Sequence, residues 1–170
     1  MKLKSLLIVL FILFTLNGSG QQNPGWEPWN FLIGTWKGTG KGEPGKGGGT
    51  FSFTYDLDQN ILVRKSHSEY PATAQKPKTV HDDLIIIYPD STGVPAKAIY
   101  FDNEKHVIHY SVTCRDESII FTSQKNGNTP VFRLTYTPIK PGKINTLFEW
   151  SQNGTTFMTY VEGKSTRIGE

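Results

Sequence analysis

The sequence contains a single cysteine, Cys114, so no disulfide within the chain can stabilise the fold. It also lacks a strong excess of charge of either sign, because 18 Lys and Arg residues face 15 Asp and Glu residues and the formal net charge is only +3. A chain this close to neutrality has no electrostatic signature of nucleic-acid binding, and no nucleic-acid partner is expected. The fold must therefore be held together by the packing of its side chains.

Long apolar runs are also scarce. The only one, at residues 6–16, is shorter than the roughly 20 residues that a bilayer span requires. Two lysines precede it and the small residues of NGSG (17–20) follow it, an order typical of a secretory signal peptide. We predict cleavage after Gly20, with an uncleaved membrane anchor as the alternative. The expected product, residues 21–170, is a single exported domain, periplasmic or extracellular, without a membrane span.

No segment shows a convincing helical period, apart from one turn near residues 26–31. Instead, short runs rich in β-branched and aromatic residues alternate with turn-forming sequences such as KNGNTP and PIKPG. About ten strands are predicted, at residues 33–39, 50–57, 61–70, 83–89, 96–102, 106–113, 118–124, 131–137, 143–150 and 155–163.

Ten short strands joined by hairpin-length links predict an all-β, antiparallel, up-and-down meander. Because no helices are available to cover a face, the meander is expected to close into a β-barrel, which removes its exposed edges. A sandwich of two sheets is the competing architecture. A barrel of about ten strands is wide enough to leave a cavity, unless its own aromatic side chains fill the interior.

The histidines are the most suggestive polar residues. His106 and His109 lie three positions apart in FDNEKHVIHY. On a strand, such positions point to opposite faces, so these two side chains cannot bind one metal ion together. In an up-and-down barrel, however, the ends of the third and fifth strands lie at the same rim as the starts of the fourth and sixth. This rim is expected to collect His67, Glu69, His81, Asp82, Asp102 and His106.

Three interpretations of this rim remain open. Histidine and carboxylate ligands suit zinc or similar ions, and His–Asp pairs suit proton transfer. The rim could instead make polar contacts to a ligand, or be polar simply because loops are solvated. Arg64 and Arg133 lie mid-strand among apolar neighbours, where an inward arginine would need a carboxylate partner. An outward direction is the expectation for both. The candidate ligand-binding residues are His67, His81, Asp102, His106, His109, Arg64 and Arg133.

Two further signals are weaker than they first look. GTGKGEPGKGGGT contains most of a phosphate-binding loop, but Gly47 stands where Ser or Thr is needed and a strand follows instead of a helix. We expect this segment to be a flexible hairpin loop over the barrel mouth. Cys114 lies at a strand end beside a charged turn and shows no arrangement that would make it a nucleophile.

The opening FLIGTWKGTG, the meander and the ending TYVEGKSTR resemble the calycin superfamily, which includes lipocalins, fatty-acid-binding proteins and ten-stranded nitrobindin-like barrels of uncharacterised bacterial families. The resemblance implies that Gly34 and Trp36 pack against Arg167, or against Lys164, and close the end opposite the histidine rim. Nitrobindins bind haem through a histidine near the C-terminus. This chain has no histidine after His109, so haem would require another residue, such as His67 or His109.

The sequence favours a non-catalytic binding or carrier protein for a small apolar or amphipathic molecule. The first alternative is a metal- or haem-binding protein or an enzyme that uses the rim cluster. The second is a structural or interaction module without a small ligand. No cofactor and no catalytic residue are predicted, and haem and zinc are kept as alternatives.

Overall fold

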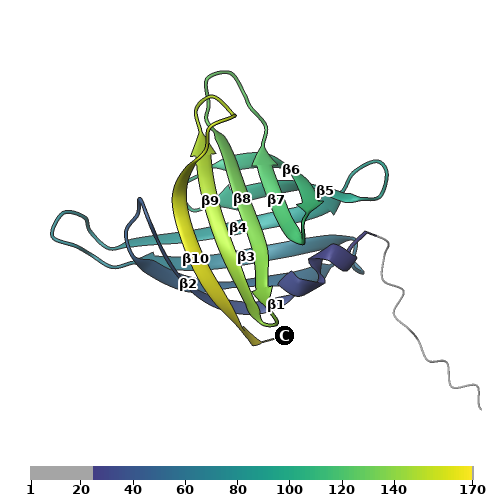
Figure 1. Ribbon diagram of the computed structural model, residues 1–170, viewed down its shortest axis with the longest axis horizontal. Coiled ribbons are helices and arrows are strands. Elements are labelled where there is room, and N and C mark those ends of the chain that lie inside the picture. The colour runs from purple at the N-terminus through teal and green to yellow at the C-terminus, as the bar shows by residue number, and fades with distance from the viewer. Residues whose placement is uncertain (1–24, 170) are drawn as a thin grey trace, which may run out of the picture.

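The protein is a closed antiparallel barrel of ten strands, seen in a computed structural model that describes residues 25–169 (Figure 1). The predicted signal peptide and its cleavage site lie outside these residues. A short 3₁₀ helix, η1 (Glu27–Leu32), precedes the barrel. The strands are β1 (Gly34–Gly42), β2 (Gly47–Asp56), β3 (Ile61–Tyr70), β4 (Thr79–Pro89), β5 (Pro95–Asp102), β6 (Val107–Arg115), β7 (Ser118–Ser123), β8 (Val131–Lys140), β9 (Lys143–Ser151) and β10 (Met158–Gly169).

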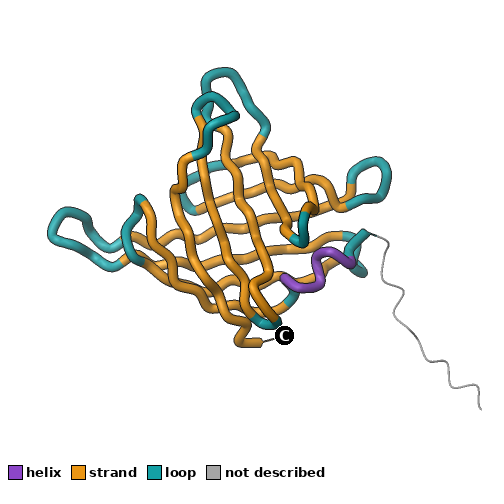
Figure 2. Tube along the Cα trace, in the orientation of Figure 1, coloured by secondary structure: helices purple, strands orange, loops and turns teal. Residues whose placement is uncertain are grey.

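Each strand pairs with its neighbours in sequence, and β1 pairs with β10 to close the sheet. The predicted up-and-down barrel is therefore confirmed, and the sandwich is not observed. All ten predicted strands are present, joined by loops at the two ends of the barrel (Figure 2). Within the described residues, no helix is long and apolar enough to cross a membrane.

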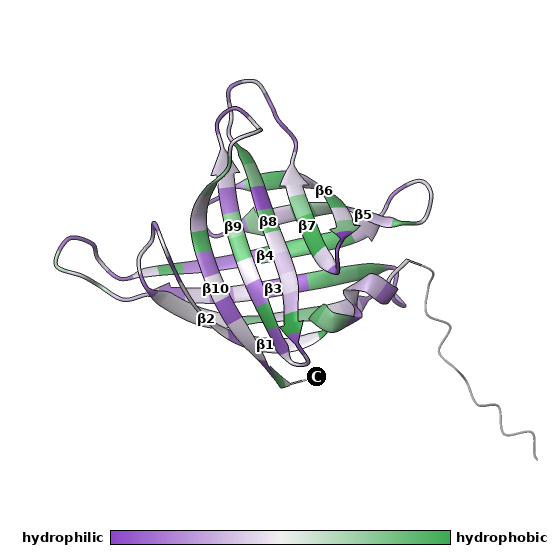
Figure 3. Cartoon of the chain, in the orientation of Figure 1, coloured by the Kyte–Doolittle hydropathy of each residue, from purple (hydrophilic) through white to green (hydrophobic). Residues whose placement is uncertain are grey.

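The strands form because apolar side chains recur at alternate positions, where they reach the same face. On β4, for example, Ile85 and Ile87 are fully buried inside the barrel, whereas Ile86 lies on the outer face and is half-buried. Hydrophobic bands recur along the strands in this way, and the long connections are mainly hydrophilic (Figure 3).

One end of the barrel is closed by η1. Trp29 and Leu32 of this helix are fully buried, and the Trp29 ring meets the Phe121 ring edge-on at 5.8 Å between centroids. The Trp36 indole Nε1 donates a hydrogen bond of 2.8 Å to the Leu32 carbonyl, which ties η1 to the start of β1. The helix thus acts as a plug whose position is fixed by packing and by one buried hydrogen bond.

Trp36 and Arg167 complete this closed end. The Arg167 guanidinium lies 4.8 Å from the centre of the Trp36 ring, and its Nη2 donates to the Phe31 carbonyl at 2.7 Å. Lys164, the alternative partner, is exposed to solvent. The closure of one end by Trp36 and Arg167, expected from the calycin resemblance, is therefore confirmed.

The half of the barrel next to this end is filled by its own side chains. Its largest inward side chains are fully buried; they are Trp36, Phe53, Leu62, Ile85, Ile87, Ile119, Phe121, Tyr136 and Ile144. Among the aromatic rings, Tyr136 meets both Phe53 and Phe121 edge-to-face. Burial of each such side chain contributes about 1.5–3 kcal/mol to folding. Packing of this kind supplies the stability that the single cysteine cannot.

The glycine-rich segment differs from the expectation of a long flexible loop. β1 continues to Gly42 and β2 begins at Gly47, so only residues 43–46 form the connection. Glycine is required here because neighbouring strands approach closely: a Cβ added to Gly49 would lie 2.0 Å from the His67 carbonyl oxygen. The glycines thus allow strongly curved strands instead of a loop that could cover the mouth.

Candidate functional site

The open end of the barrel lies opposite η1, where β3 and β5 end and β4 and β6 begin. The strand register decides which side chains enter it. Opposed inward positions on β2 and β3 carry Gly49 and Ser68, and Ser68 in turn faces His81 on β4. The inward positions of β1, β2 and β3 at this end therefore carry mainly glycine and serine, apart from Tyr70, whose ring lies over Gly47.

A chain of polar groups follows the inner wall from β3 to β6. Arg64 forms an ion pair with Asp83, and both side chains are almost buried. The second oxygen of Asp83 lies 3.8 Å from His81 Nε2, which is 2.9 Å from the Tyr100 hydroxyl. Tyr100 donates this hydroxyl proton to Asp102 Oδ2 at 3.0 Å. Because Tyr100 donates its only hydroxyl proton to Asp102, the His81 Nε2–H must be the donor in the hydrogen bond between His81 and Tyr100.

The chain ends at the β5–β6 turn. The His106 ring Nδ1 lies 2.8 Å from Asp102 Oδ2, and the His106 backbone N–H donates to Oδ1 of the same carboxylate at 2.9 Å. Glu104, in the same turn, places Oε1 3.4 Å from His81 Nδ1. The structure thus brings three predicted residues together, His81, Asp102 and His106.

The protonation states follow from these contacts. Burial, together with the nearby carboxylates of Asp83 and Asp102, raises the pKa of Tyr100 far above its ordinary value, so this phenol remains protonated. Burial also acts to raise the pKa of Asp102, but the hydrogen bonds from His106 and Tyr100 outweigh it and the pKa is lowered. Asp102 is therefore a carboxylate at neutral pH.

Arg64 is the clearest departure from expectation, since it points into the barrel instead of outward. Burial disfavours its charge, yet Asp83 more than compensates and the pKa of Arg64 is raised. The carboxylate that an inward arginine needs is thus supplied from β4. Burial raises the pKa of the neighbouring Tyr136 to about 12. Arg64 Nε and the Tyr136 hydroxyl lack a partner of good hydrogen-bond geometry within residues 25–169.

The opposite wall of the open half is aromatic. Phe132 on β8 and Phe148 on β9 stack with centroids 5.9 Å apart and planes inclined by 13°, and Tyr160 on β10 meets Phe148 edge-on at 5.8 Å. Phe132, Phe148 and Trp150 face inward but remain only half-buried, unlike the inward residues near η1. These three inward rings are therefore partly accessible to solvent.

The remaining predicted residues lie on the outer face. His67 Nδ1 is 2.7 Å from Asp82 Oδ1, outside the barrel, and half of its side chain is exposed. His109 is likewise exposed and faces outward on β6. Arg133 points outward as expected, with Nε 2.8 Å from Glu149 Oε2 and its guanidinium 3.8 Å from the centre of the Phe157 ring. These three predicted residues do not join the interior chain.

Three residues of this site are not among the candidate residues predicted from the sequence: Asp83 and Tyr100 inside the barrel, and Glu104 in the turn at the rim. The inward direction of Asp83 could have been predicted from the sequence, because Asp83 lies two and four positions before Ile85 and Ile87 and therefore shares their face of the strand. Tyr100 had a weaker signal, since it alternates with Ala98. Glu104 lies in a turn, where no period specifies a direction.

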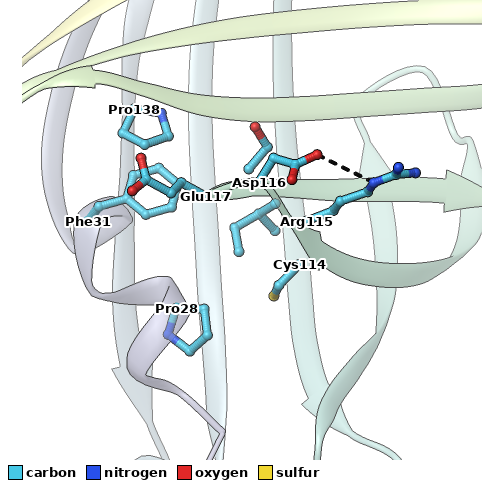
Figure 4. A pocket seen from close by; sticks show the side chains of 9 residues that line it. Pro28, Phe31, Cys114, Arg115, Asp116, Glu117 and Pro138 are labelled. Carbon is cyan, nitrogen blue, oxygen red and sulfur yellow. Dashed lines mark ion pairs between the residues drawn. The ribbon is translucent and has the colours of Figure 1, made fainter.

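A separate hollow of about 470 Å³ lies at the closed end, between η1 and the β6–β7 turn (Figure 4). Pro28, Phe31 and Pro138 line it, with Cys114 at its edge. Burial raises the pKa of the Cys114 thiol, which lowers its reactivity. Arg115, Asp116, Glu117 and Ser118 also line this hollow, but the Arg115–Asp116 ion pair is almost fully exposed. The polar groups of the open end are more buried and form a connected chain, so the open end is the candidate functional site.

No known family matches the sequence, and no curated protein matches it. Solved structures do match the fold. Rv2717c from M. tuberculosis is 11% identical with a TM-score of 0.58, over 85% of this chain and 98% of that chain. The S-type phycobiliprotein lyase CpeS from Guillardia theta is 8% identical with a TM-score of 0.52, over 84% and 91%. Both are calycin-like ten-stranded antiparallel barrels, so the calycin-like fold predicted from the opening motif is confirmed.

Proposed function

We propose that the protein is a non-catalytic binding protein that holds one small amphipathic molecule in the open half of its barrel. The observation that carries the proposal is the division of the inner wall. One side presents the half-buried rings of Phe132, Phe148 and Trp150, and the other presents the polar chain from Arg64 to Asp102. Between them, the inward positions of β1 to β3 carry mainly glycine and serine, and the proposal places the ligand beside these small residues.

The polar chain indicates the kind of group that the ligand carries. The positive charge of Arg64 is already neutralised by Asp83, so a carboxylate on the ligand would be left without a counter-charge. Arg64 Nε and the Tyr136 hydroxyl are fully buried below this chain, so the polar groups left to meet a ligand are those of His81 and Tyr100, which suit a hydrogen-bonding group. The proposed ligand is therefore a molecule with an aromatic or aliphatic part and a polar end that carries no negative charge.

The fold comparison adds general support. A barrel of the same architecture is, by its name, a phycobiliprotein lyase, so the fold is compatible with handling a small molecule or its protein conjugate. Binding outside the cytoplasm is part of the proposal and rests on the predicted signal peptide at residues 1–20. His67 and His109 point outward, so neither takes part in the ligand site of this proposal.

A fluorescence titration with N-phenyl-1-naphthylamine, a neutral amphipathic dye, tests this function. We expect saturable binding of one dye per barrel to the wild-type protein. Ser68→Trp places a large ring at an inward position of β3 and is expected to weaken binding at least about tenfold, a loss of about 1.4 kcal/mol. Thr50→Trp, at an exposed outward position on β2, is the matched control and retains binding. Equal binding by all three proteins, or none by the wild type, would contradict the proposal.

A further inference from the structure

We propose that the rim of the barrel contains a site for a divalent metal ion, with His81, Asp102 and Glu104 as ligands and His106 as the fourth. The four residues come from three places. His81 lies near the start of β4, Asp102 ends β5, and Glu104 and His106 belong to the turn that leads to β6. This site shares His81 and Asp102 with the polar side of the proposed ligand site, but it is argued from the geometry of the rim and does not rest on that function.

The ligand atoms are close enough to surround one ion. One donor atom from each of His81, Asp102 and Glu104 lies within 4.8 Å of the other two. His106 Nδ1 lies 2.8 Å from Asp102 Oδ2 and 3.9 Å from Glu104 Oε2, so it borders the same space. Tetrahedral zinc with bonds of about 2.0–2.2 Å holds its ligand atoms about 3.3–3.6 Å apart, so the widest pair must approach by about 1 Å. Small side-chain rotations are therefore enough to form the site.

Asp102 is held in place before any ion arrives. Its side chain is only 2% exposed. Oδ1 accepts backbone hydrogen bonds from Glu104 at 3.0 Å and from His106 at 2.9 Å, and Oδ2 accepts the Tyr100 hydroxyl at 3.0 Å. A carboxylate oriented by three donors is the arrangement that surrounds protein metal ligands.

His81 shows a second feature of a metal ligand. Its Nε2 donates to the Tyr100 hydroxyl at 2.9 Å, which leaves Nδ1 as the ring nitrogen available to a metal ion. That nitrogen is the one directed toward Glu104 Oε1, 3.4 Å away. Ligating histidines commonly use one ring nitrogen for the metal and the other for an outer hydrogen bond. Tyr100 supplies that outer partner here.

The donor set selects the class of metal. Two imidazole nitrogens and two carboxylate oxygens suit Zn²⁺, whereas Ca²⁺ and Mg²⁺ prefer oxygen ligands alone and Cu(I) prefers sulfur. The two carboxylates also balance the charge of a divalent ion. Zn²⁺ is therefore the ion to test first.

Calorimetric titration of the protein, without a histidine tag, with Zn²⁺ alone tests the site. We expect one Zn²⁺ per chain in the wild type and in His109→Gln, whose exposed histidine lies outside the cluster on β6. His81→Gln and Glu104→Gln are each expected to weaken binding at least about tenfold. Glu104 is half-exposed in a turn, so its variant tests the site without altering the core.

Histidine-ring NMR spectra provide the second readout. On addition of Zn²⁺, the ring signals of His81 and His106 are expected to shift, and those of His109 to remain in place. Absence of stoichiometric binding would overturn the proposal. Equal affinity in the wild type, His81→Gln and Glu104→Gln would also overturn it, because the ion would then be bound adventitiously elsewhere.

Discussion

Arg64 and Asp83 form an ion pair inside the barrel, across β3 and β4, with only 10% and 7% of their side-chain surfaces exposed. The Arg64 guanidinium also lies 5.2 Å from the centre of the Phe51 ring. The pair is situated where the filled half of the barrel gives way to the open half. It therefore forms the polar floor of the proposed binding site.

Removal of one partner of this ion pair is expected to be costly. Arg64→Met leaves Asp83 buried without a counter-charge, and we expect a loss of about 3–5 kcal/mol in the free energy of unfolding. The double variant Arg64→Met/Asp83→Leu removes both charges and is expected to recover most of this loss. Urea denaturation of the three proteins measures the difference. A single variant as stable as the wild type would show that the pair is not desolvated as described.

The closed end gives a second prediction. Arg167→Ala removes the contact with the Trp36 ring and the hydrogen bond to the Phe31 carbonyl. We expect a loss of about 1–3 kcal/mol in the free energy of unfolding. Lys164→Ala, at an exposed position on the same strand, serves as the control. It is expected to change the free energy of unfolding by less than about 0.5 kcal/mol. Equal effects in the two variants would contradict a specific role for Arg167.

The outer pair His67–Asp82 predicts a pH dependence. The hydrogen bond to the Asp82 carboxylate raises the pKa of His67 above its ordinary value, with a smaller contribution from Glu69. Because the raised pKa favours the protonated ring in the folded state, the pair stabilises the fold below about pH 6.5. This stabilisation is lost as the pH rises through the pKa of His67 in the folded protein.

An NMR titration of the His67 ring protons measures this shift. We expect Asp82→Asn to lower the pKa of His67 toward its ordinary value. Asp58→Asn, in an exposed turn at the opposite end of the barrel, is expected to leave it unchanged. A pKa that does not respond to Asp82→Asn would show that the two side chains do not pair in solution.

The curved glycine strands give a fourth prediction. In Gly49→Ala, the new methyl group would meet the His67 carbonyl oxygen, so the backbone must move apart at that point. We expect the free energy of unfolding, measured by thermal or urea denaturation, to fall by about 1–3 kcal/mol. Ser52→Ala, outward on the same strand, is expected to change stability by about 0.5 kcal/mol or less. A fully stable Gly49→Ala protein would indicate that the strands are farther apart than the structure shows.

The fold could be predicted from sequence because its signals are local. Turn sequences such as PIKPG separate short alternating runs, and each predicted strand is found. The Gly34–Trp36 motif and Arg167 also identified the closed end correctly. The extension of β1 and β2 through Gly42 and Gly47 could not be predicted, because glycine favours loops unless close strand approach requires it.

The site was harder to predict because its polar residues are specified by pairing across strands. Arg64 and Arg133 have similar apolar neighbours in sequence, yet Arg64 faces inward to Asp83 and Arg133 outward to Glu149. Only the register of β3 with β4 and of β8 with β9 separates the two cases. The convergence of His81, Asp102 and His106 followed from up-and-down topology alone, whereas the linking role of Tyr100 did not.

Native mass spectrometry of the purified protein tests most directly whether the open half of the barrel holds a small molecule. The protein would be isolated from its producing cells without dialysis and, in parallel, exposed to a cell extract of small molecules. We predict one bound organic molecule per wild-type chain, kept in Thr50→Trp and lost in Ser68→Trp. A wild-type chain that carries no molecule after either treatment, or a bound molecule that Ser68→Trp retains equally well, would contradict the account.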